Sequence, residues 1–206
     1  MKLKKKAKLT IIGVALILII ALAAVIVINF MPKKEKVKEI KVLKSIDEYG
    51  YELKDNKTKK YKEMFKELED ILREDEVNQE EYAKKVAEMF VYDFYSLEDK
   101  VAKTDVGGVD FVHPDALDNF LLNAEDTYYK YIESNIYGER KQDLPAVDTI
   151  TVESITPTEF AYNKAKHEGY EVKVNWTYTN EKFSSYQKSA VVVLIKKDIK
   201  YYVVEI

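Results

Sequence analysis

Apolar and polar positions follow three different patterns along this chain, and each pattern predicts a different kind of element. Residues 9–31 are apolar on every face, apart from Thr10 and Asn29. As a helix, this segment would be about 34 Å long, which covers a hydrocarbon core of about 30 Å. Residues 1–8 carry five lysines and no acidic residue. The pattern therefore predicts a basic cytoplasmic N-terminus over 1–8 and a transmembrane anchor over 9–31, which contacts the lipid bilayer.

A cleaved signal peptide is the alternative interpretation of the apolar segment. Ala21-Leu22-Ala23 has the small-x-small form that a signal peptidase accepts, but eight more mostly apolar residues follow it. Lysines flank the segment on both sides, so the charge count alone does not decide the orientation. A single anchor with a basic start is usually inserted with its N-terminus inside. We therefore expect a single-pass protein of the cell membrane, with its C-terminal domain outside the cytoplasm.

A helical period of three to four residues follows the anchor. Residues 32–55 are highly charged and are expected to be a tether to a folded domain over 56–206. Asn78 is placed to cap the second of three helices, because helix N-caps favour short polar side chains. Gly107-Gly108 predicts a turn before the third helix. The three apolar stripes are Tyr61, Met64, Phe65, Leu68, Ile71 and Leu72; Tyr82, Val86, Met89, Phe90, Phe94 and Leu97; and Leu117, Phe120, Leu121, Ala124, Tyr128, Tyr131 and Ile132.

After the third helix, expected to end between Asn135 and Gly138, the period changes to two residues, which is typical of strands. The last two strands are expected to form an antiparallel hairpin, because Lys197 and Asp198 leave only a short turn between them. This order favours an α+β domain with about three helices packed on a curved antiparallel sheet of four to five strands. The segments that predict strands are residues 147–155, 159–165, 170–178, 189–196 and 200–206.

Charge and composition exclude several classes of function. The net charge of −3 hides an acidic body, because residues 45–206 carry 22 basic and 34 acidic side chains. An acidic domain argues against nucleic-acid binding, which requires a basic face. The chain has no cysteine, which excludes disulfides, thiolate metal sites and cysteine nucleophiles. No cofactor is expected, and the abundance of Lys, Ile, Glu and Tyr is interpreted as an AT-rich bacterial coding style.

The search for catalytic motifs finds no glycine-rich phosphate loop, no G-x-S-x-G elbow and no H-E-x-x-H helix. One polar cluster, which spans residues 105–118, offers donors for a hard divalent cation, with Asp110, His113 and Asp115 as the candidates. Asp110 and His113 are also considered as an acid–base pair. The alternative interpretation is helix capping by Asp115 and its neighbours, which we favour because the spacing is not that of a calcium loop. No metal is therefore expected.

Tyrosine is unusually abundant, with 16 tyrosines against 8 phenylalanines. Tyr128 and Tyr131 on the third helix, with Trp176 and Tyr178 on a strand, are candidates for a ligand or partner surface. Tyrosine suits such surfaces, because its ring is apolar while its hydroxyl stays wet. Packing in the core with the hydroxyls at its edge is the alternative interpretation. His167 lies in a polar stretch and is expected at the surface.

The order of anchor, tether, helices and strands resembles membrane-anchored domains of the nuclear transport factor 2-like fold. Such domains occur in conjugation and type IV secretion channel assembly proteins, and the resemblance covers residues 57–206. It rests on the layout of the elements and implies a scaffold role through protein–protein contacts. Because this fold also hosts enzymes and binders, the site must decide between these classes.

Two functions remain open at this point. The first is a non-enzymatic protein-binding or scaffold component of a bacterial envelope or transfer assembly, in contact with other envelope proteins. The second is a small-ligand-binding module or enzyme with a pocket between the helices and the concave sheet. The second requires polar groups such as Asp110 or His113 to converge inside that pocket. The sequence favours the first, because it shows no catalytic signature.

Overall fold

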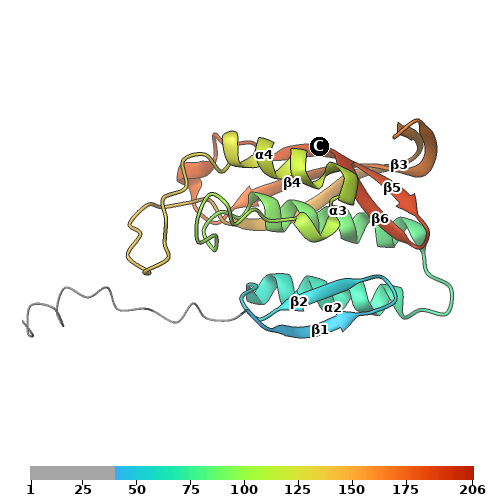
Figure 1. Cartoon of the computed structure of the whole chain (residues 1–206), viewed down its shortest axis with the longest axis horizontal. Helices are drawn as coiled ribbons and strands as arrows, with labels where there is room; N and C mark the ends of the chain where they lie inside the picture. Colours follow the sequence, from blue (N-terminus) through green and yellow to red (C-terminus); the bar gives the residue numbers. More distant parts are fainter. Residues whose placement is uncertain (1–39) are drawn as a thin grey trace, which may run out of the picture. The chain divides into compact units, whose positions relative to one another are not determined.

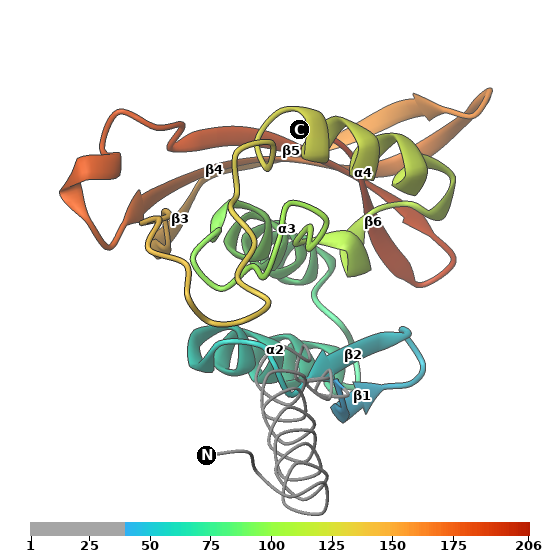
Figure 2. The same cartoon turned by 60° about the vertical axis from the view of Figure 1, so that its left-hand side comes forward.

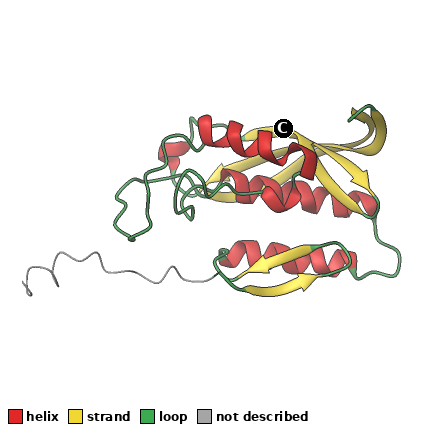
Figure 3. Ribbon diagram, viewed as in Figure 1, coloured by secondary structure: helices red, strands yellow, loops and turns green. Residues whose placement is uncertain are grey.

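Helices precede the main antiparallel strands in the part of the chain that the computed structural model describes, residues 40–206 (Figures 1 and 3). The anchor expected at 9–31 and the basic N-terminus lie outside these residues. Within 40–206, no helix has both the length and the apolar character needed to cross a bilayer. The elements are β1 (Val42–Ile46), β2 (Tyr51–Lys54), α2 (Lys59–Leu72), α3 (Gln79–Tyr95), η1 (Val109–Phe111), η2 (Pro114–Ala116), α4 (Leu117–Asp126), β3 (Val147–Tyr162), β4 (Ala165–Tyr178), η3 (Glu181–Phe183), β5 (Ser189–Lys197) and β6 (Lys200–Glu205).

The expected α+β class is confirmed. Strands β3, β4, β5 and β6 form a four-stranded antiparallel sheet in this order, and the three helices α2, α3 and α4 pack against it. Strands β1 and β2 form a separate two-stranded hairpin. The view in Figure 2 places α3 between the sheet and the layer that holds α2 and this hairpin. Each strand of the sheet follows its neighbour directly in the sequence; β3–β4 and β5–β6 are joined by two-residue turns, and β4–β5 by a longer connection that contains η3.

Helix α3 is the centre of the core because it is apolar on more than one side. Its predicted stripe is buried, and Val86, Met89 and Phe90 have no exposed surface. Asn78 caps the helix as expected, with its side-chain oxygen accepting from the backbone N–H groups of Glu80 and Glu81. Helix α2 buries its own predicted stripe, apart from the half-buried Ile71, and lies against α3.

The third helix is shorter than expected and ends at Asp126. The reason is Tyr129, which is fully buried and donates its hydroxyl proton to the carbonyl of Phe94 at 2.6 Å. An uninterrupted helix would keep Tyr129 on the polar side of the predicted stripe. The chain leaves the helix at Thr127, whose hydroxyl donates back to the carbonyl of Asn123. The chain therefore loses the last turns of the expected helix, and the burial of Tyr129 compensates for their hydrogen bonds.

The expected tether over 32–55 is wrong for its C-terminal half. Residues 42–54 form the β1–β2 hairpin, whose Tyr51 and Leu53 are buried in the core. The hydroxyl groups of Tyr51 and Tyr82 lie 2.9 Å apart, which ties the hairpin to α3. In β2 only alternate residues face inward, and the charged residues between them gave the segment the composition of a linker. The hairpin therefore belongs to the same compact unit as residues 56–206.

The strands expected at 147–155 and 159–165 form one long strand, β3, apart from the last residues, which make the turn into β4. Pro157 does not interrupt it, because β3 is an edge strand and the missing N–H faces no partner on its outer side. The turn to β4 uses Asn163 and Lys164, both with positive φ, as two-residue hairpins require. The β5–β6 hairpin is confirmed, with Lys197 opposite Lys200.

Candidate functional site

Two polar regions stand out in the described chain, and the first is a buried charge cluster on α3. We call it the Asp93 cluster; it consists of Asp93, Lys57, Lys100 and the backbone of Gly108. Asp93 is 3% exposed, and its carboxylate lies 2.6 Å from Lys57 Nζ and 3.0 Å from Lys100 Nζ. The backbone N–H of Gly108 donates to the same carboxylate at 2.8 Å. Lys57 precedes α2, whereas Lys100 and Gly108 belong to the loop after α3, so the carboxylate joins these two segments to α3.

The electrostatics of this cluster indicate a structural role. Burial alone would raise the pKa of Asp93, but the charges of Lys100 and Lys57 and the N–H of Gly108 outweigh it and lower the pKa to about 2. The pKa of Lys100 is raised, because Asp93 and Asp99 outweigh its own loss of hydration. A carboxylate held by three donors and this acidic is not available as a base near neutral pH. The loop after α3 passes so close to Asp93 that only glycine fits at position 107. A Cβ on Gly107 would lie 1.9 Å from the backbone carbonyl oxygen of Asp93.

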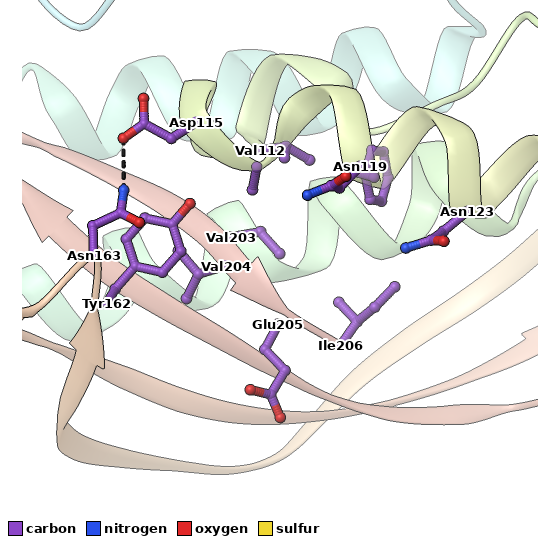
Figure 4. A pocket seen from close by; sticks show the side chains of 12 residues that line it. Val112, Asp115, Asn119, Asn123, Tyr162, Asn163, Val203, Val204, Glu205 and Ile206 are labelled. Carbon is purple, nitrogen blue, oxygen red and sulfur yellow. Dashed lines mark hydrogen bonds between the residues drawn. The ribbon is translucent and has the colours of Figure 1, made fainter.

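The second region is an open cavity of about 430 Å³ beside α4 (Figure 4). We call it the α4 groove. One wall carries Asp115, Asn119 and Asn123 from η2 and α4, at intervals of four residues. Residues four apart lie on one side of a helix, so these three polar side chains form a row. The opposite wall is the end of β6, with Glu205, and the floor is apolar, with Phe120 and Val203 among its side chains.

The turn between β3 and β4 closes one end of the α4 groove. The side chain of Asn163 donates to the Asp115 carboxylate at 2.7 Å (Figure 4). Tyr162, next to it in the sequence, has its ring 4.9 Å from the ring of His113, in an edge contact. These contacts join the tip of a long hairpin to the start of α4. They involve the special backbone of Asn163, whose φ is +49°.

The candidate metal ligands do not come together as a set. His113 is 2% exposed and accepts the backbone N–H of Asp115 at its Nδ1. Burial and the nearby charge of Lys197 lower the pKa of His113, so its neutral form is favoured. Asp110 lies 3.7 Å from Lys54 Nζ and does not line the α4 groove, whereas Asp115 does. Among residues 40–206 there is no group of three His, Asp or Glu side chains placed to hold a metal ion.

Three of the four candidate aromatic residues meet around Tyr95. The ring of Trp176 lies 4.2 Å from that of Tyr95, and the ring of Tyr128 lies 5.0 Å from it. The hydroxyl groups of Tyr128 and Tyr178 lie 3.1 Å apart. Tyr131 is different, because it is 76% exposed and lies in the turns after α4. The four residues therefore do not form one surface, and Trp176, which is 3% exposed, belongs to the core.

A second cavity, of about 500 Å³, lies beside this aromatic group, and we call it the tyrosine cavity. Its lining includes Tyr95, Thr127 and Tyr128, and it shares Ile206 with the α4 groove. Burial raises the pKa of Tyr128 and raises that of Tyr95 to about 12, so both hydroxyls stay protonated near neutral pH. The indole N–H of Trp176 is buried and has no hydrogen-bond partner within residues 40–206.

Sequence reasoning missed the Asp93 cluster and, of the polar residues that line the α4 groove, named only Asp115 and not the side chains that surround it. A buried Asp93 was recognisable in principle, because it interrupts an apolar run, FVYDFY, on a helix that is otherwise buried on several sides. Asn119 and Asn123 carry no such mark, since spaced asparagines look like an ordinary solvated helix face. The contribution of Asn163 and Glu205 depends on the hairpin tip and the end of β6 reaching α4, which no local pattern reports.

Comparisons of this chain with protein-family models, with curated proteins and with solved structures find no match in any of the three. The site therefore has to be interpreted from its own geometry. Its polar groups are amides and carboxylates on an open, partly apolar groove, which is an arrangement for binding.

Proposed function

We propose that this chain is a single-pass, membrane-anchored protein whose domain lies outside the cytoplasm and binds other proteins without catalysis. In this proposal it is a scaffold component of a bacterial envelope or transfer assembly, and a partner segment occupies the α4 groove. The observation that carries the proposal is the groove itself, with its apolar floor and its row of Asp115, Asn119 and Asn123. Specific interfaces combine such an apolar centre with a polar rim.

The chemistry of the groove supports binding over catalysis. Asp115 is held by Asn163, and His113 uses its Nδ1 to accept a backbone N–H. Asn119 and Asn123 are amides, which neither take up nor release protons near neutral pH, and the one further carboxylate that lines the groove, Glu205, is exposed. Amides do donate and accept hydrogen bonds at once, which suits them to a polypeptide backbone. The resemblance in layout to membrane-anchored nuclear transport factor 2-like domains agrees with a scaffold role.

The anchor part of the proposal rests on residues 9–31, which are long and apolar enough to span a bilayer. Its test is extraction of native membranes with alkaline carbonate, followed by protease treatment of intact cells without their wall. The full chain should stay in the pellet, and external protease should digest its domain. Release into the supernatant, or protection from the protease, would contradict this part.

The binding part is tested by crosslinking the tagged full-length protein in its native membrane, followed by purification and mass spectrometry. Asn123→Trp places a large side chain in the groove. Leu122→Trp is the matched control, because Leu122 is on the same helix, is 62% exposed and does not line the groove. A defined set of envelope proteins should be captured by the wild type and by L122W, and lost in N123W.

The same experiment has a clear opposite outcome. If N123W captures the same proteins as L122W, the α4 groove is not the binding site. If the wild type is recovered alone, under conditions that capture a known membrane complex, the scaffold function itself is wrong. Equal melting temperatures of the two variants would show that neither result is caused by misfolding.

Small-ligand binding is the second candidate function, and the tyrosine cavity favours it. Trp176 has a buried donor without a partner, and its ring lies against Tyr95, which lines that cavity. A compound that binds there should raise the melting temperature of the wild type. It should have no effect on Thr127→Trp, in which the new side chain fills the cavity. A library without any such compound would leave the scaffold function as the better account.

A further inference from the structure

The α4 groove and the tyrosine cavity are two cavities that share a lining residue, and we call the two together the trough along α4. Both are lined by Ile206, and their helix-side residues follow one another from Asp115 through Asn119 and Asn123 to Thr127. Twelve steps along the chain separate the first of these residues from the last, which corresponds to about 18 Å at the rise of an α-helix. An extended polypeptide advances about 3.3 Å per residue, so the trough accommodates about five or six residues.

The spacing of the asparagines fits an extended chain. Asn119 and Asn123 are exposed and stand one turn apart on the side of α4 that faces β6 (Figure 4). Their separation along the axis is about 6 Å, and an extended polypeptide repeats about every 6.7 Å, or two residues. Each amide has both donors and an acceptor, so each can engage one N–H and one C=O of a backbone beside it.

The charge of the trough selects among such peptides. No lysine or arginine lines either cavity, whereas Asp115 and Glu205 both line the α4 groove. The Asp115 carboxylate is bound by a neutral amide, and Glu205 is exposed. The body that surrounds them, residues 45–206, carries 22 basic and 34 acidic side chains. A basic segment would be attracted to this site and an acidic one repelled.

We infer that the trough along α4 binds an extended segment of a partner protein, about six residues long, with lysine or arginine side chains that meet Asp115 on one wall and Glu205 on the other. This inference rests on the proposed protein-binding function and names the chemistry of the segment. The apolar floor, with Phe120 and Val203, takes the side chains on the inner face of the segment. The amide row holds its backbone.

The test uses the full-length protein in nanodiscs of zwitterionic lipid. The probe is a fluorescein-labelled synthetic peptide of about six residues in which lysine and valine alternate, and its fluorescence anisotropy is measured. The same peptide with glutamate in place of lysine is the control probe. The lysine peptide should bind, its affinity should fall as salt rises, and the glutamate peptide should not bind.

Variants connect this binding to the trough. Glu205→Gln should weaken binding of the lysine peptide about fivefold, and Asn119→Leu with Asn123→Leu about tenfold. Glu171→Gln is the matched control, because Glu171 is an exposed glutamate on β4 that lines neither cavity. It should leave the affinity unchanged. Equal losses in E205Q and E171Q would overturn the inference, because the attraction would then be a property of the whole acidic body.

Two further outcomes separate this inference from the proposed function. If the lysine peptide does not bind, or the glutamate peptide binds equally well, the inference is overturned. The groove dependence of the crosslinked partners in native membranes would then still stand on its own. If a neutral oligosaccharide such as chitopentaose binds and the peptides do not, the trough recognises a glycan and the inference is equally wrong.

Discussion

The Asp93 cluster and the α4 groove both contain carboxylates, yet their surroundings are opposite. Asp93 is 3% exposed and holds two lysines and a backbone N–H, all from the chain itself. In the groove, Asp115 is met by one amide and a neutral histidine, and Glu205 is exposed. The first set of charges is paired inside the fold, and the second set lines an open cavity.

The difference shows how the surroundings of a charged side chain indicate its role, without comparison to related proteins. A buried carboxylate must be paired, because an isolated buried charge is very costly, and its partners then reveal a structural task. A carboxylate beside an open cavity is hydrated and needs no partner within the fold. Substitutions should therefore separate the two regions by what they change, with stability for the cluster and binding for the groove.

The largest expected effect is that of Asp93→Asn. The substitution leaves the half-buried Lys57 without its carboxylate partner and the buried Lys100 with Asp99 alone, and should lower the free energy of unfolding by about 3–5 kcal/mol. Urea unfolding followed by circular dichroism measures this loss. Asp99→Asn is the control, since Asp99 contacts Lys100 from a more exposed position and should cost less than about 1 kcal/mol. Similar losses in both variants would mean that the cluster is not a connected unit.

The acid dependence of stability gives a second and smaller effect. The folded pKa of Asp93 is lowered to about 2, so its contribution is complete above the unfolded value of about 3.9 and is lost as the pH falls toward 2. Over this pH window, the free energy of unfolding should fall by about 2 kcal/mol more in the wild type than in D93N. Parallel acid curves for the two proteins would contradict the pairing.

A still smaller effect is expected at the end of the groove, at Asn163. Alanine at this position would lose the hydrogen bond to Asp115 and occupy a left-handed backbone conformation, with a cost of about 1–2 kcal/mol. Glycine loses the same bond but accepts the backbone, so N163G should cost less than N163A. Thermal unfolding distinguishes them. If both are as stable as the wild type, the hairpin tip is not joined to α4 in solution.

The smallest effect on stability is expected in the groove proper. Glu205→Gln should change the free energy of unfolding by less than about 0.5 kcal/mol, because the side chain is exposed. The same variant should lose affinity for the lysine peptide, which D99N should not. A strong destabilisation by E205Q would mean that Glu205 has a structural role and is not a binding residue.

The sequence predicted the elements best where one local pattern decided them. The stripes of α2 and α3, the Asn78 cap and the β5–β6 hairpin all depend on residues close in the chain. The end of α4 and the β1–β2 hairpin were missed because distant contacts decide them. Tyr129 leaves the helical pattern for the carbonyl of Phe94, and Tyr51 meets the hydroxyl of Tyr82.

The site was much less predictable than the fold. Of the candidate residues, Asp115 lines the α4 groove and Tyr128 lines the tyrosine cavity. Tyr131 and Asp110 line neither of them. A groove is made by surfaces that meet after folding, and the polar residues on its walls look like any solvated residues in the sequence. Here the relevant meeting is between α4 and the end of β6, about eighty residues apart along the chain.

Trp176 has a consequence of a different kind. It is the only tryptophan in the chain, so all indole fluorescence of the protein comes from one point beside Tyr95. A buried indole emits at shorter wavelengths than a hydrated one, and its neighbours Tyr95 and Tyr128 line the tyrosine cavity. The emission spectrum therefore distinguishes two events. Unfolding shifts the emission to the red, whereas displacement of water from that cavity leaves the emission of the buried indole unshifted.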